Sequence, residues 1–339
     1  MKILNLFCTL ALIGTLSINK SQAQAQPAAN VINFKSVANL PYPLTWTTSV
    51  TDGNYIYTIC GYKGFGGFSS DVLRYDPQVN KWSVLANMGG NKIQTAAAYV
   101  PATGKIYVMG GIGGVGGLGT VRTDAQIFQG VQTVDTKTGK VENIHVLNPM
   151  ASTYGSAVEW NNKIYVFGGT RDGKRTINSL YEFDPLTQKF TQLANMPESL
   201  QAAGAVVNGV IYTFGGYDAF TRRQSYSINA YDIKTNTWKK VGKLPQFLSA
   251  NSVSACGDKI FVVGGLDNED FIGYYDIAAN QFTKLKSNLE QRRAAVSAVY
   301  NNYLFVFGGS TRFKAFKSST LQTSEVANLA PFLSSSASK

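Results

Sequence analysis

A pair of adjacent glycines follows a short apolar run five times in this chain of 339 residues, and a Cys-Gly pair stands ahead of them in a similar setting. The second glycines of successive pairs are 50, 58, 47, 49 and 44 residues apart. A repeat of this length fits four-stranded propeller blades and is too long for most helical repeats. The six pairs are Cys60-Gly61, Gly110-Gly111, Gly168-Gly169, Gly215-Gly216, Gly264-Gly265 and Gly308-Gly309.

Each repeat carries the pattern of four strands, which is clearest in the third, at residues 156–193. Its first turn, Asn161-Asn162, holds residues that tolerate the positive φ of a two-residue hairpin. The first strand of a repeat is poor in bulky groups, as at 95–98, which crowding around a central axis requires, so we place it innermost. An aromatic residue such as Trp82 follows the third strand, and we expect it to lie on the outermost strand and to cover the gap between blades.

The two ends of the chain predict how the ring closes. After Gly309 a single strand-like stretch remains, at 321–327, whereas residues 32–41 repeat the pattern of an outermost strand. We therefore predict an all-β, six-bladed β-propeller over residues 26–333, in which the N-terminal strand completes the last blade and no sheet edge stays open. Residues 334–339 are expected to form a disordered tail.

The N-terminus reads as an export signal. Lys2 precedes an apolar stretch at 3–18, and residues 23–25 form a small-x-small cleavage site. We predict that residues 1–25 are a signal peptide and that the mature protein is secreted or periplasmic. No other segment has the length and apolarity of a membrane span.

The chain is poor in metal-binding and nucleophilic side chains. Beyond the signal segment the cysteines are Cys60 and Cys256, which fall in the first and fifth repeats and hence on non-adjacent blades. We expect them to be buried and unbridged. The single histidine, His145, lies beside apolar residues. We therefore expect no metal site and no cofactor.

At this level of detail the chain resembles the kelch-repeat proteins, whose blades carry a diglycine, then Tyr-Asp-Pro, then Trp, and the resemblance covers residues 31–333. The matching residues are Tyr75-Asp76-Pro77 with Trp82, Phe183-Asp184-Pro185 with Phe190, Tyr231-Asp232 with Trp238, and Tyr275-Asp276 with Phe282. The second repeat departs from the pattern with Val134-Asp135, and the sixth has no Tyr-Asp pair. The resemblance implies a kelch-type propeller and an exported bacterial member of the family.

What the resemblance implies about activity is less specific. The family includes a sialic acid mutarotase, protein-binding platforms and copper-radical sugar oxidases, and a fold alone does not choose among them. The oxidases need two histidines and a tyrosine cross-linked to cysteine, and this chain has one histidine.

The arginines are distributed unevenly. If the strands run alternately up and down, the loops after each glycine pair and the loops between blades emerge on one face of the ring. Eight of the nine arginines fall in these loops, and Arg74 is the exception. Arginine offers a rigid fork for carboxylate, sulfate or phosphate and stacks on aromatic rings. The residues predicted to bind a ligand are Arg171, Arg175, Arg222, Arg223, Arg292, Arg312, Tyr217, Phe220, Tyr226 and Phe313.

A structural reading of the same arginines stays open at this stage. Kelch blades often place an arginine just before the inner strand, where it caps the blade, and other loop arginines have Asp172, Asp218 or Asp270 as potential partners. The net charge of +11 does not by itself point to nucleic acid. Export removes the protein from cytoplasmic nucleic acid, so an anionic cell surface or polysaccharide is the better match.

Two classes of function follow. The first, which we favour, is an exported, non-enzymatic binding platform for an acidic glycan, an acidic peptide or a protein partner. The second is a sugar mutarotase or epimerase, with Glu198 or Glu290 as the base and an arginine on the substrate carboxylate. A carboxylate beside two or more arginines at the mouth of the central channel would favour the enzyme. The sequence leaves the oligomeric state open.

Overall fold

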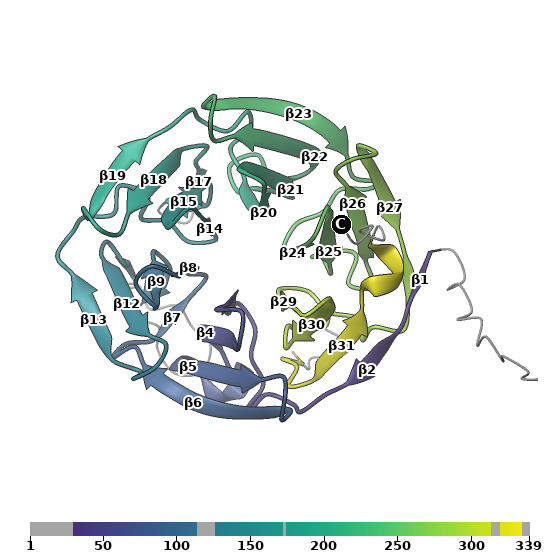
Figure 1. Ribbon diagram of the computed structural model, residues 1–339, viewed down its shortest axis with the longest axis horizontal. Coiled ribbons are helices and arrows are strands. Elements are labelled where there is room, and N and C mark those ends of the chain that lie inside the picture. The colour runs from purple at the N-terminus through teal and green to yellow at the C-terminus, as the bar shows by residue number, and fades with distance from the viewer. Residues whose placement is uncertain (1–29, 114–125, 172–173, 313–318, 334–339) are drawn as a thin grey trace, which may run out of the picture.

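The computed structural model describes residues 30–113, 126–171, 174–312 and 319–333. Within these ranges, six four-stranded antiparallel sheets are arranged around a common centre (Figure 1). We number these blades 1 to 6 by repeat. The described ranges contain strands and two short 3-10 turns, η1 (Gly64–Gly66) and η3 (Ala330–Phe332), which confirms the all-β prediction. The predicted signal peptide, 1–25, and the predicted tail, 334–339, lie outside them.

In blades 1 to 5 the strands follow in chain order from the centre outward. Blades 1 to 3 consist of β3 (Thr48–Thr51), β4 (Ile56–Tyr62), β5 (Phe68–Asp76) and β6 (Lys81–Asn87); β8 (Ala96–Val100), β9 (Lys105–Met109), β12 (Val131–Asp135) and β13 (Val141–Ile144); and β14 (Ser156–Trp160), β15 (Lys163–Phe167), β18 (Leu180–Asp184) and β19 (Lys189–Gln192). Blades 4 and 5 consist of β20 (Gln201–Val207), β21 (Val210–Asp218), β22 (Arg223–Asp232) and β23 (Thr237–Lys243); and β24 (Ser252–Cys256), β25 (Lys259–Val263), β26 (Ile272–Asp276) and β27 (Gln281–Lys284).

Blade 6 unites the two ends of the chain. Its inner strands are β29 (Val296–Tyr300), β30 (Tyr303–Phe307) and β31 (Ser324–Asn328), and its outermost strand is the N-terminal β2 (Phe34–Ser36), which pairs antiparallel with β31. Ahead of it, β1 (Val31–Ile32) pairs with β28 (Lys286–Ser287) beside blade 5. This confirms the predicted closure. Short strands at the loops are β7 (Lys92–Ile93), β10 (Ile112–Gly113), β11 (Gln126–Ile127), β16 (Thr170–Arg171) and β17 (Arg175–Thr176).

The hydrophobic core is divided among the blade interfaces. Six buried clusters are found, and each joins two neighbouring blades. Successive side chains of a strand point to opposite faces of a sheet, so one strand serves two clusters. In β9, Ile106 and Val108 pack against blade 1, whereas Tyr107 and Met109 pack against blade 3. Each blade is therefore stabilised by both of its neighbours.

The glycine pairs allow neighbouring blades to approach closely. A Cβ atom on Gly168 would overlap the carbonyl oxygen of Leu200, which lies just before β20 of the next blade. Gly110, Gly215, Gly264 and Gly308 meet the next blade's carbonyl in the same way, and all five have φ between 56° and 69°. Glycine is thus favoured at the first position of these five pairs for two reasons. The backbone there is left-handed, and a side chain would overlap the neighbouring blade.

A Trp-Asn clamp holds the link between blades at the rim. In blade 4, the indole N–H of Trp238 donates to the carbonyl of Ala194 at 2.8 Å, and the Ala194 amide donates to Asn236 Oδ1 at 2.8 Å. In blade 1, Trp82 and Asn80 hold Ala38 in the same way, at 2.9 Å and 2.7 Å. Each tryptophan lies on an outermost strand and contacts the preceding blade's exit, as the repeat pattern predicted.

The two cysteines are free and buried, as expected. Cys60 has φ 55° and occupies the first-glycine position of blade 1, where its side chain packs in the cluster between blades 1 and 2. Burial raises the pKa of its thiol to about 12, and the neighbouring Lys92 opposes this only in part. The thiol is therefore neutral and unreactive at physiological pH.

We expect Gly168→Ala to destabilise the fold more than Gly104→Ala. The two glycines have nearly the same φ, 63° and 65°, but a Cβ on Gly104 would have no atom within 4 Å. The strained backbone costs about 1–2 kcal/mol in both variants, and overlap with Leu200 adds about 1–3 kcal/mol in Gly168→Ala alone. Unfolding in guanidinium chloride measures the free energy of unfolding of both variants. Equal losses of stability would contradict the close contact between Gly168 and the Leu200 carbonyl.

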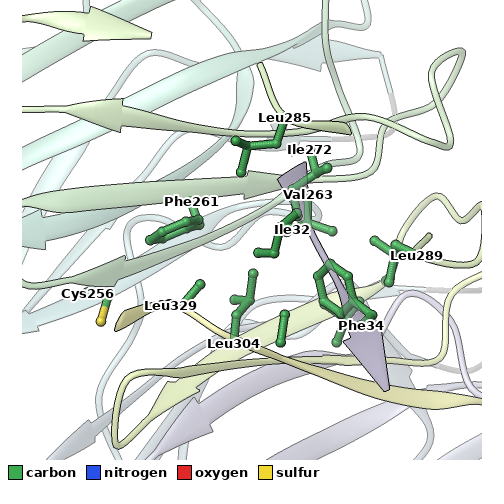
Figure 2. Packing of buried hydrophobic residues seen from close by; sticks show 13 residues of the cluster. Ile32, Phe34, Cys256, Phe261, Val263, Ile272, Leu285, Leu289, Leu304 and Leu329 are labelled. Atoms are coloured by element: carbon green, nitrogen blue, oxygen red, sulfur yellow. The ribbon is translucent and has the colours of Figure 1, made fainter. Parts of the chain in front are cut away.

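Phe34 tests the closure of the ring. Its side chain is 4% exposed and lies with Ile32 among residues of blades 5 and 6 (Figure 2). We expect Phe34→Ala to lower the free energy of unfolding by about 3–5 kcal/mol, because it removes a buried ring from that cluster. Lys35→Ala, on the exposed side of the same strand, is the control and should leave the thermal midpoint nearly unchanged. A midpoint equally unaffected by Phe34→Ala would mean that β2 contributes little to closure.

Candidate functional site

A hollow of about 740 Å³ opens at the centre of the ring, where the six innermost strands begin. Alanine, serine and threonine from these strands form most of its wall, and we call it the channel hollow. Small side chains are needed here because adjacent innermost strands contact one another around the axis. The larger polar and aromatic side chains that line it are Trp46, Gln94, Tyr154, Lys174, Gln201, Tyr217, Arg222 and Asn251.

A series of backbone hydrogen bonds runs around the mouth of this hollow. It links the residues two positions ahead of the innermost strand in five blades, namely Ala250, Ala294, Trp46, Gln94 and Tyr154. From Ala294 onward, each amide donates to the carbonyl of the preceding member, which gives four hydrogen bonds of 3.0 to 3.4 Å. All five residues have positive φ, between 49° and 60°. The left-handed conformation costs about 1–3 kcal/mol per residue, and here it turns the peptide groups toward the neighbouring blades.

Blade 4 interrupts this series. Its equivalent residue is Gln201, which pairs with Tyr217 inside the sheet of β20 and β21. The series therefore ends at Tyr154 on one side of blade 4 and at Ala250 on the other. The strands of blade 4 continue past the glycine pair, and the hairpin from Asp218 to Arg223 extends over this part of the channel hollow.

Several polar and aromatic side chains of the hollow come from blade 4 and from its neighbour, blade 3. Tyr217 and Arg222 come from the blade 4 hairpin and Lys174 from the blade 3 hairpin. Tyr154 contacts Trp46 edge to face, with ring centroids 5.3 Å apart at 83°. The described lining residues include two cations and no carboxylate. This part of the hollow is suited to an anion that also offers a surface for aromatic contact.

A second hollow of about 460 Å³ lies beside the first, and we call it the side hollow. It brings together three predicted ligand residues, Arg171, Arg175 and Phe220. Phe220 is 77% exposed, and the Arg171 guanidinium donates to the carbonyl of Pro149. Thr176, Ile177, Ser199 and Asp218 complete the lining.

Three predicted ligand residues line neither hollow. Arg223 is exposed at the start of β22, opposite Asp218. Arg312 forms an exposed ion pair with Asp267 at 2.7 Å. Tyr226 packs against Phe247, with ring centroids 4.9 Å apart and with Lys240 and Lys243 over its ring, on the side of the outermost strand. Phe313 lies outside the described residues.

Arg292 requires a correction, because the predicted ligand residue is fully buried. Its guanidinium donates to the carbonyls of Gly308 and Thr323 and pairs with Glu325 and Glu290. Burial lowers the pKa of the arginine, and the two carboxylates counteract that effect. Arg292 thus fastens the link between blades 5 and 6 to the closing blade, which is the structural alternative left open by the sequence.

Neither candidate base reaches the channel hollow. The Glu198 carboxylate accepts long hydrogen bonds from Ser225 at 3.3 Å and from Asn229 at 3.4 Å, both on blade 4. Glu290 is held by Arg292 and by the hydroxyl of Thr323. Both carboxylates are engaged in contacts between chain segments. Neither of them lines a hollow together with the arginines found there.

Trp46 and Gln201 were missed by sequence reasoning. Trp46 precedes the innermost strand β3 by two residues, and Gln201 occupies the equivalent position in blade 4, where it is the first residue of β20. This fixed position in the repeat is the signal that identifies them. In the described part of the chain, no group of three His, Cys, Asp or Glu side chains is placed to hold a metal. No helix found there is long and apolar enough to cross a bilayer.

Comparison with known proteins places the chain in a family. Residues 46–265 match the KLHDC2/KLHL20/DRC7 Kelch-repeats domain. This match covers more than half of the chain, which therefore belongs to the kelch-repeat family.

The curated relatives are longer proteins. Kelch-like protein 38 of Rattus norvegicus is 28% identical over 260 residues, which is 76% of this chain and 42% of the relative. Kelch-like protein 23 of Homo sapiens is 30% identical over 209 residues, covering 60% of this chain and 34% of the relative. The chain thus spans less than half the length of these two relatives.

A solved structure shows the same fold. The structure titled "Structure of YjhT" superposes with a TM-score of 0.70, at 20% identity, over 85% of this chain and 95% of that one.

Replacement of buried Arg292 and of exposed Arg312 tests whether the two arginines contribute differently to stability. We expect Arg292→Met to lower the free energy of unfolding by about 3–5 kcal/mol, because Glu325 would keep a buried charge without its partner. Arg312→Met removes an exposed pair and should cost less than about 1 kcal/mol. Chemical denaturation measures both, and an Arg292→Met protein as stable as the unmodified one would mean that Arg292 does not stabilise the closing blade.

Proposed function

We propose that this protein is an exported, non-enzymatic binding platform whose channel hollow captures an acidic ligand. The kelch family favours a protein-binding platform, in which loops carry recognition on a rigid ring. One observation carries the proposal. Arg222 and Lys174 face the hollow together with Trp46, Tyr154 and Tyr217, while the described lining contains no carboxylate.

The chemistry of the wall favours an acidic glycan over an acidic peptide or a protein partner. Flat aromatic side chains stack on the apolar faces of sugar rings, and Trp46, Tyr154 and Tyr217 line the hollow. The hydroxyls of Ser49, Ser156 and Ser252 are hydrogen-bonded to neighbouring blades. The guanidinium of Arg222 would orient a carboxylate through paired hydrogen bonds. A volume of about 740 Å³ is within the range of small-molecule sites.

The alternative, a mutarotase or epimerase on an acidic sugar, requires a base beside the bound ring. Glu198 and Glu290 are held elsewhere, as described above. Asp218 lines the side hollow with two arginines, but its oxygens accept the Phe220 amide at 3.0 Å and the Thr221 hydroxyl at 2.7 Å. Burial alone would raise the pKa of Asp218, but these bonds outweigh it and lower the pKa. A carboxylate held in its ionised form by turn contacts is a poor proton shuttle.

Neighbouring arginines provide a matched test. Arg222 lines the channel hollow and Arg223 does not. We expect Arg222→Lys, which keeps the charge but loses the fork, to weaken calorimetric binding of trigalacturonate by about 1–3 kcal/mol. Arg223→Lys and Lys234→Ala, the latter on the turn after β22, should bind like the unmodified protein.

Three results would contradict the proposal. If trigalacturonate and triglutamate both fail to bind, the hollow is not an acidic-ligand site. If Arg222→Lys binds as tightly as the unmodified protein, the guanidinium fork plays no part. If the protein accelerates the interconversion of galacturonate anomers in NMR and Glu198→Gln abolishes this, the enzymatic alternative is correct.

A further inference from the structure

Lysines are concentrated on one part of the outer rim of the ring, where β23 and β27 lie side by side (Figure 1). Three exposed lysines lie on β23, one on β27 and one on β28. We call this surface the basic rim, and its members are Lys239, Lys240, Lys243, Lys284 and Lys286. A lysine on an edge strand prevents pairing with another chain. The outermost strands β6 and β19 have one lysine each, so β23 has more than this role requires.

The positive charge of the basic rim is continuous. The outermost strands β23 and β27 contact each other, and β28 follows β27 and pairs with β1. Segments 233–250 and 277–289, which include these strands, contain no Asp or Glu. Among the described residues, no ion pair is found for the five lysines, whereas Lys163 on blade 3 pairs with Glu182 at 2.7 Å. The basic rim therefore presents uncompensated charge to the solvent.

Aromatic rings hold several of these cations in place. The ammonium groups of Lys240 and Lys243 lie 5.5 Å and 5.4 Å from the centroid of the Tyr226 ring. Tyr226 packs against Phe247, which is 54% exposed at the end of the basic rim. The Lys284 ammonium lies 5.6 Å from the centroid of a buried ring of blade 5. Such cation–π contacts restrain the ammonium groups while leaving them available to an anion.

The type of cation indicates the kind of partner. A guanidinium binds a single carboxylate or phosphate through a rigid fork, whereas an ammonium is a hydrated point charge without a preferred bidentate geometry. Segments 233–250 and 277–289 contain lysine and no arginine. A row of point charges suits an extended anionic surface better than one small ligand. Exposed aromatic rings beside lysines are typical of protein surfaces that rest on lipid headgroups.

We propose that the basic rim binds the surface of an anionic lipid bilayer, with Phe247 among the headgroups. The negative potential of such a surface attracts each lysine that lies close to it. This contact goes beyond the proposed function and does not depend on it, because the basic rim lies on the circumference of the ring and the channel hollow at its centre (Figure 1). A ring held by its edge leaves the channel hollow open to a ligand.

Co-sedimentation with vesicles tests the inference. Vesicles of equal parts phosphatidylcholine and phosphatidylglycerol should bind the protein about tenfold or more tightly than vesicles of phosphatidylcholine alone. Neutralising the three lysines of β23 should remove about tenfold or more of this affinity. A matched control removes three exposed lysines from blades 1 to 3 and should change the affinity by less than about threefold. The two variants are Lys239→Gln/Lys240→Gln/Lys243→Gln and Lys81→Gln/Lys137→Gln/Lys189→Gln.

Two further measurements separate the contributions of charge and of the aromatic ring. Added sodium chloride should weaken binding to the mixed vesicles, because salt screens exposed charges. Phe247→Ala should weaken it by about threefold or more, because an inserted ring is lost. Thermal midpoints verify that every variant is folded.

Other outcomes overturn the inference. Equal losses in the two triple variants would mean that net charge alone acts, and no loss in the β23 variant would mean that the basic rim is not the contact. Tighter binding of dextran sulfate than of mixed vesicles, lost in the β23 variant, would assign the rim to an anionic polymer. Trigalacturonate calorimetry on the β23 variant should match the unmodified protein, so failure of the lipid contact and failure of the channel site are distinguishable.

Discussion

The close contact between each glycine pair and the next blade's carbonyl is the constraint on which the ring depends. It sets how near a blade comes to its neighbour, and the buried clusters, the small innermost side chains and the rim clamps all follow from that spacing. Blade 1 meets the requirement differently, with Cys60 in a left-handed conformation and its side chain in the adjoining cluster. A side chain is thus tolerated at one of the six positions, where the packing accommodates it.

The candidate site arises where the sixfold pattern is broken. Five blades present a left-handed residue to the channel mouth, and four backbone hydrogen bonds join these residues in series, whereas blade 4 uses Gln201 in its own sheet. The strands of blade 4 also continue past its glycine pair, and Tyr217 and Arg222 of this hairpin line the hollow. The interrupted hydrogen-bond series and the extended blade 4 hairpin coincide, which is the pattern expected of a functional position on a repetitive scaffold.

Arginine serves two separate purposes in this molecule. Arg292 is buried among carbonyls and carboxylates, and its guanidinium binds these groups and stabilises the closing blade. Arg171 and Arg222 lie at the surface of the two hollows, where a guanidinium can meet a ligand. The same residue type in the same class of loop therefore has a structural role in one blade and a candidate binding role in another, and burial decides between them.

The amino-acid sequence by itself determined the blade count, the innermost and outermost strands and the N-terminal closure, because glycine spacing and strand alternation are local and repeat in every blade. It also predicted that eight arginines lie in loops of one face, but it could not separate buried Arg292 from exposed Arg171, since their flanking residues carry no signal of depth. The grouping of Trp46, Tyr154 and Arg222 came only from the tertiary structure. Those residues belong to blades 1, 3 and 4, and the curvature of the ring, which no local pattern encodes, brings them to one hollow.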